Sequence, residues 1–111
     1  MTKGGGTFRG GFAEFQRQAM RIQRRLEEVQ EQMKTRTQEA AVGGGKVKAV
    51  VSGAKEVVSV SIDPEVIKPE DAAMLQDLVV SAVNAALRKV DEMIDEETNK
   101  VTGGLKIPGL T

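Results

Sequence analysis

Residues 46–64 read KVKAVVSGAKEVVSVSIDP, two valine-rich runs separated by a short polar segment. In both runs apolar residues recur at every second position, which is the period of a β-strand with one covered face. Residues 52–55 supply turn chemistry between the runs, and Pro64 ends the second because proline lacks the amide donor that a strand ladder needs. We therefore predict an antiparallel hairpin that is covered on one side.

The segment after the hairpin predicts a long helix. Pro69 followed by Glu70 and Asp71 favours a helix start, because proline suits the first turn and acids suit the positive end of the helix dipole. A broad apolar face follows, and Gly103-Gly104 stops the helix at about Thr102. The apolar tail, residues 105–111, is expected to be either docked or disordered.

The segment before the hairpin carries a narrow heptad pattern, called the seam below. Its members follow one another in steps of three and four: Phe12, Phe15, Ala19, Ile22, Leu26, Val29 and Met33. We predict a helix from Gly11 to Lys34 that needs a partner helix, supplied either by the same chain or by another copy. Residues 1–10, rich in glycine, are predicted to form a flexible basic arm.

Between this helix and the hairpin, Thr37 to Val42 is predicted to be an edge strand, and three consecutive glycines after it force a loop. The order is then helix, three strands, helix. The sequence predicts a single α+β domain over residues 1–111, with a long helix on each side of a three-stranded antiparallel sheet.

Composition excludes several kinds of chemistry. The 111 residues include no Cys and no His, so that disulfides, ordinary zinc sites and Ser-His or Cys-His nucleophiles are ruled out. Gly43 to Lys46 resembles a phosphate loop, but Val47 stands where Ser or Thr should hold magnesium. We expect no enzyme activity, catalytic residue, cofactor, metal or small-molecule substrate, and a cytoplasmic protein without a membrane span.

Positive charge is concentrated near the N-terminus, although the formal net charge of the chain is +0. In the heptad frame Arg17, Arg21 and Arg24 face away from the seam, and Lys3, Arg9 and Arg25 add to them. Because charges are screened beyond about 8 Å at physiological salt, a local basic surface can bind duplex DNA within a neutral protein. Alternatively, these arginines form a solvated face and pair with acids four residues away, such as Arg24 with Glu28.

Four segments together resemble the YbaB/EbfC family of bacterial nucleoid-associated proteins: KVKAVVSG (46–53), VVSVSIDPE (57–65), LQDLV (75–79) and GGLKIPG (103–109). The resemblance implies an α-β-β-β-α protomer, an intertwined homodimer with helices projecting like tweezers, and nucleoid DNA binding with little sequence preference. It implies no catalysis. Family members commonly carry Gln and Met along the first helix, whereas this chain has Phe12, Phe15 and several arginines, so the role of these arginines cannot be taken from the family.

Two functions from other classes compete with DNA binding. The first is a coiled-coil adaptor that binds another protein through the Phe-rich end or the apolar tail. The second is an amphipathic helix on an anionic membrane surface, with basic residues opposite phenylalanine. The seam is too narrow and regular to favour lipid over a partner helix, so we expect no membrane partner.

Overall fold

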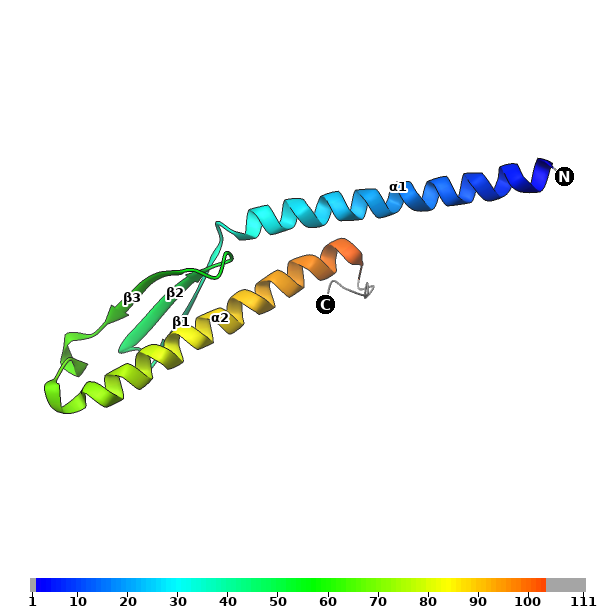
Figure 1. Cartoon of the computed structure of the whole chain (residues 1–111). Coiled ribbons are helices and arrows are strands. Elements are labelled where there is room, and N and C mark those ends of the chain that lie inside the picture. The colour runs from blue at the N-terminus through cyan, green and yellow to red at the C-terminus, as the bar shows by residue number, and fades with distance from the viewer. Residues whose placement is uncertain (1, 104–111) are drawn as a thin grey trace.

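The computed structural model describes the backbone of residues 2–103 and the side chains of residues 11–103. The elements in chain order are α1 Thr2–Met33, β1 Thr37–Val42, β2 Val47–Ser52, β3 Val57–Ile62, the 3₁₀ helices η1 Pro64–Val66 and η2 Pro69–Asp71, and α2 Ala72–Thr102 (Figure 1). The predicted α+β class and α-β-β-β-α order are confirmed. The tail, residues 105–111, lies outside the described residues.

The sheet has the strand order β1-β2-β3, and both pairs are antiparallel. The edge strand and the hairpin are therefore where the sequence predicts them. At the end of β3 the Asp63 carboxylate accepts a hydrogen bond of 2.9 Å from the backbone amide of Glu65. This contact caps η1, and it gives the Asp-Pro pair a structural role at the strand end.

Helix α2 packs on β1 and β2, and the main core lies between these elements. The side chains of Val47, Val51 and Val90 are fully buried there. The prediction of a one-sided sheet holds for β2, where the inward residues are buried and Lys48 is exposed. It is wrong for β3, whose residues Val58 and Val60 are exposed. Val60 pairs with Ala49, so it lies on the covered face, but β3 extends beyond the strip that α2 covers.

Helix α1 begins at Thr2, so the predicted helix start at Gly11 is wrong. Each added helical residue contributes a backbone hydrogen bond once a helix is nucleated. A glycine costs only about 1 kcal/mol relative to alanine in a helix. The long helix that follows can therefore extend through the glycines.

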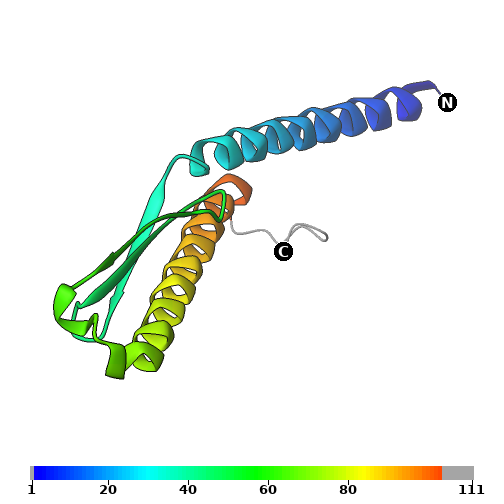
Figure 2. The ribbon, with the colours of Figure 1, turned by 60° about the vertical axis from the view of Figure 1, so that its left-hand side comes forward.

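The last turns of α1 lie beside the last turns of α2, and the rest of α1 extends past the end of α2 (Figures 1 and 2). Val29 and Met33 form a second small core with Met93 of α2. The seam was predicted to pack against a helix of the same chain or of another copy. For this part of the seam the partner is a helix of the same chain, α2.

The junction after α1 is held by a close approach of backbone. A Cβ added at Gly53, in the turn between β2 and β3, would overlap the carbonyl group of Met33 at the end of α1. The Gly53 amide also donates a hydrogen bond of 2.9 Å to the Arg36 carbonyl. Only glycine fits this contact, which seats the end of α1 on the turn.

Candidate nucleic-acid interface

The N-terminal two thirds of α1, residues 2–22, form a projecting rod that we call the arm. The chain measures 84 × 20 × 16 Å along its principal axes, and the arm accounts for much of the long dimension (Figure 1). An isolated rod can enter a groove or lie along a duplex without interference from the body. Within the arm, most side chains of residues 11–22 are exposed.

Three arginines on α1, Arg17, Arg21 and Arg24, form what we call the arginine row. Their spacing of four and three residues places them on one side of the helix, because an α-helix turns once every 3.6 residues. All three are exposed, and the helical period of 3.6 residues places them on the side opposite the seam. Lys3 and Arg9 belong to the same helix, but their side chains lie outside those that the structure describes.

Acidic neighbours partly compensate this row, in a pattern that the sequence did not predict. Glu14 lies 2.9 Å from Arg17 and 3.7 Å from Arg21. Glu28 pairs with Arg25 at 3.1 Å. The alternative of a solvated arginine face had instead predicted a pair between Glu28 and Arg24. Exposed pairs of this kind are weak and are easily exchanged for a phosphate. Among the side chains of residues 11–103, Arg24 has no carboxylate within ion-pair distance.

Negative charge gathers on a separate part of the molecule. The second half of α2 exposes Asp91, Glu92, Asp95 and Glu96, and of these Asp91 pairs with Lys55 at 3.1 Å. A polyanion is repelled from this surface. The arm extends past the end of α2 and away from the body that carries these acids (Figure 2).

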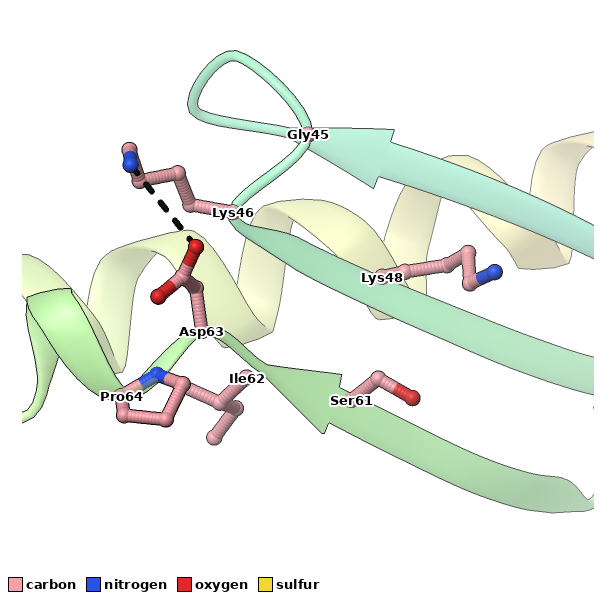
Figure 3. A pocket seen from close by; sticks show the side chains of 7 residues that line it. All are labelled: Gly45, Lys46, Lys48, Ser61, Ile62, Asp63 and Pro64. Atoms are coloured by element: carbon pink, nitrogen blue, oxygen red, sulfur yellow. Dashed lines mark ion pairs between the residues drawn. The ribbon is translucent and has the colours of Figure 1, made fainter.

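The phosphate-loop resemblance at Gly43 to Lys46 is not supported by the geometry. A strand follows the glycines, where a phosphate loop requires a helix. The Lys46 ammonium lies 2.6 Å from the Glu65 carboxylate. It also lies 3.8 Å from the Asp63 carboxylate, and both residues line a shallow pocket of about 350 Å³ (Figure 3). The carboxylates of Asp63 and Glu65 both pair with the Lys46 ammonium, so the surface around Lys46 is the site of an intramolecular ion pair.

A further ion pair, also absent from the sequence predictions, ties the junction to α2. Arg36, just before β1, lies 3.5 Å from Glu97, and Lys100 lies 3.1 Å from the same carboxylate. The hydrogen bond from Lys100, supported by the positive charges of Lys100 and Arg36, lowers the pKa of Glu97 below its usual value. Glu97 is therefore held ionised beside the end of α1.

Among the side chains of residues 11–103 there is no cluster of three or more acidic, cysteine or histidine residues that could bind a metal ion. None of the described helices combines the length and the apolar composition that a bilayer crossing requires.

A cationic helix that projects from a small α+β body is typical of small proteins that bind the phosphate backbone of nucleic acids. Comparison with known proteins identifies a narrower group. The family model described as the YbaB/EbfC DNA-binding family matches residues 9–105. The chain belongs to this family, and the predicted family resemblance is confirmed.

Individual relatives agree with the family model. The chain is 50% identical to a nucleoid-associated protein of Acetivibrio thermocellus over 99% of both chains. It is also 50% identical to one of Thermoanaerobacter sp. strain X514, again over 99% of both. The crystal structure of an uncharacterized protein of Helicobacter pylori superposes with a TM-score of 0.58 at 25% identity, covering 68% of this chain and 87% of the other.

Proposed function

We propose that this protein binds duplex DNA in the bacterial nucleoid as a homodimer, with little sequence preference, and thereby alters DNA organisation and gene expression. Membership of a DNA-binding family supports the role, as do relatives named nucleoid-associated proteins. These comparisons favour DNA binding over a coiled-coil adaptor, and they point to a binding protein and not to an enzyme.

The observation that carries the proposal is the exposed arginine row on a projecting helix. Arginine guanidinium groups bind phosphate oxygens with charge-assisted hydrogen bonds. The row offers three such groups at successive turns, together with Arg25 on an adjacent position. Lys3 and Arg9 extend the same proposal toward the tip of the arm.

Weak sequence preference follows from the type of contact. Phosphate contacts fix the position of a protein on DNA but carry no base identity, which is read by groups that reach base edges. The row is composed of arginines spaced along one outward side of α1, a pattern that suits contacts to phosphates. We therefore expect similar affinity for duplexes of unrelated sequence.

The homodimer is supported by an exposed apolar surface on β3. Val57, Val58 and Val60 are 50%, 59% and 37% exposed, and β3 is an edge strand with unpaired backbone groups on its outer side. Apolar residues grouped on a strand edge are typical of a protein–protein interface. A second copy that covers this edge would place two arms on one particle and double the number of phosphate contacts.

A salt titration tests DNA binding. The affinity for a random duplex should fall as salt rises, with a logarithmic slope of about −0.9 for each phosphate contact. The triple variant Arg17→Glu, Arg21→Glu, Arg24→Glu should bind weakly and show a flatter slope. Its control, Lys48→Glu, Lys68→Glu, Arg88→Glu, has the same change of net charge away from α1 and should keep the parent slope. Equal binding by the row variant and the parent would refute the role of the row.

Light scattering tests the homodimer. The parent should have the mass of two chains at micromolar concentration, and Val58→Asp with Val60→Asp should give single chains because the new carboxylates would be desolvated at the contact. The control Ser59→Asp with Ser61→Asp places the same charges on the polar side of β3. A single-chain mass for the parent would refute the homodimer.

A further inference from the structure

One apolar surface is not accounted for by the fold or by DNA binding. The exposed fraction of the seam residues is low near the C-terminus of α1, from 4% at Met33 to 8% at Leu26, and high near its N-terminus, where Phe12 is 56% exposed. Ile22 is half-buried, and Phe15 is 67% exposed. The change occurs where α2 ends, so the seam continues beyond the helix that covers it (Figures 1 and 2).

We propose that the C-terminal tail, extended here by Gly104 to residues 104–111, covers this exposed part of the seam from Phe12 to Ile22 on its own chain. The tail follows directly from Gly103, which caps α2 in the left-handed conformation. It therefore leaves the helix at the place where cover of the seam stops. This intramolecular contact goes beyond DNA binding and does not depend on it.

The length of the tail suits the uncovered surface. Residues 104–111 can span roughly 26 Å at about 3.3 Å per residue. The seam from Phe12 to Ile22 rises only about 15 Å at 1.5 Å per residue. The tail can therefore reach Phe12 even with a change of direction at Pro108-Gly109.

The chemistry of the tail also suits this surface. Leu105, Ile107 and Leu110 supply aliphatic side chains, and Leu105 and Ile107 have the two-residue spacing that presents side chains on one side of an extended chain. Phe12 and Phe15 offer aromatic rings to them. Pro108 limits the conformational entropy that the tail loses on docking.

A second copy is the other occupant that the seam could take, and two arguments favour the tail. The uncovered part of the seam spans less than two heptads, whereas a coiled coil is typically sustained over about three to four. The tail is also tethered next to its site, and a short tether gives an effective concentration on the order of millimolar. The arginine row lies on the opposite side of α1, so a docked tail leaves it free.

Paired cysteines test the contact, since the natural chain contains none. Ala19→Cys with Ile107→Cys places one thiol on the seam and one on the tail. The control, Met20→Cys with Ile107→Cys, moves the first thiol by one residue to an exposed position about 100° around the helix. An undocked tail reaches both positions equally, whereas a docked tail should form the Ala19→Cys disulfide several-fold faster, within one chain by intact mass.

Two outcomes would overturn the proposal. Equal rates for the two cysteine pairs would show that the tail does not dock on the seam. A disulfide between two chains of the single variant Ala19→Cys, formed faster than the disulfide within one chain of the Ala19→Cys, Ile107→Cys variant, would show that a second copy covers the seam.

Hydrogen exchange provides a measurement without cysteines. Leu105→Ser with Ile107→Ser should raise the exchange rates of amides from Phe15 to Ile22 several-fold, and leave those from Leu26 to Met33 unchanged. Lys106→Ser is the matched control. Unchanged exchange in the double variant would contradict docking, and DNA affinity measured on the same samples reports separately on the arginine row.

Discussion

The two parts of α1 carry one apolar pattern in two different environments. Near its C-terminus, Leu26, Val29 and Met33 are buried against the body of the protein. Toward the N-terminus, Phe12 and Phe15 continue the same heptad into solvent and share their helix with the arginine row. One part of the helix therefore fixes α1 to the fold, and the other is available for binding. A heptad pattern by itself does not distinguish these roles.

The largest expected effect is a difference in the free energy of unfolding between substitutions in the buried part and in the exposed part of α1. Met33→Ala removes a buried side chain from the small core and should lower the free energy of unfolding by about 2–5 kcal/mol. Met20→Ala makes the same chemical change at an exposed position of the arm and should cost at most about 0.5 kcal/mol. Urea unfolding followed by circular dichroism at one protein concentration measures both. Similar losses would contradict the division of α1.

The next effect concerns the seat of α1. Gly53→Ala introduces a methyl group that overlaps the Met33 carbonyl, and the required shift should cost about 1–3 kcal/mol. Because the end of α1 must move, the maximum dimension measured by small-angle scattering should change as well. Ala54→Ser, in the same turn, is the control and should change neither quantity. A stable Gly53→Ala variant of unchanged shape would show that the turn does not position α1.

A smaller effect lies within the arm itself. Glu14→Gln releases Arg17 and Arg21 from a carboxylate that competes with phosphate. Exposed ion pairs are worth about 0–1 kcal/mol, so the affinity for duplex DNA should rise by at most about fivefold. Glu27→Gln makes the same charge change on α1 and should raise it less. An equal increase for the two variants would attribute the effect to net charge alone.

The smallest effect is a dependence on pH at the other end of α1. Lys100 and Arg36 lower the pKa of Glu97, so the ionised form stabilises the folded state above the ordinary pKa of 4.5. This contribution should be lost as the pH falls through the lowered pKa of the folded state. Thermal unfolding between pH 6 and 3 should therefore show a flatter acid limb for Glu97→Gln than for the parent. Parallel profiles would indicate that the ion pair does not stabilise the junction.

Most of the fold could be predicted because local patterns determine it. The alternation in β2 and β3, the turn between them and Pro64 after Asp63 each act over a few residues. The C-terminal glycine cap of α2 is local in the same way. Such features are written in the sequence at the position where they act.

The remaining features depend on contacts between distant elements. The exposure of Val58 and Val60 depends on where α2 crosses the sheet, which no strand pattern reveals. Gly53 is recognisable as a turn residue, but its contact with Met33 appears only when α1 is in place. The arginine row follows from spacing, whereas the position of Glu14 between two arginines depends on side-chain conformation.

The contact at Gly53 fixes the base of α1, so a small change of angle at this contact produces a large displacement at the tip of the helix. Helix α1 has 32 residues and is therefore about 48 Å long, so a tilt of about 5° at its base moves its tip by about 4 Å. That displacement is comparable to the spacing of successive base pairs, about 3.4 Å. In a particle with two such helices, the turn at Gly53 would therefore set the distance between the two tips. It would thus limit the thickness of a molecule held between them, without contacting that molecule.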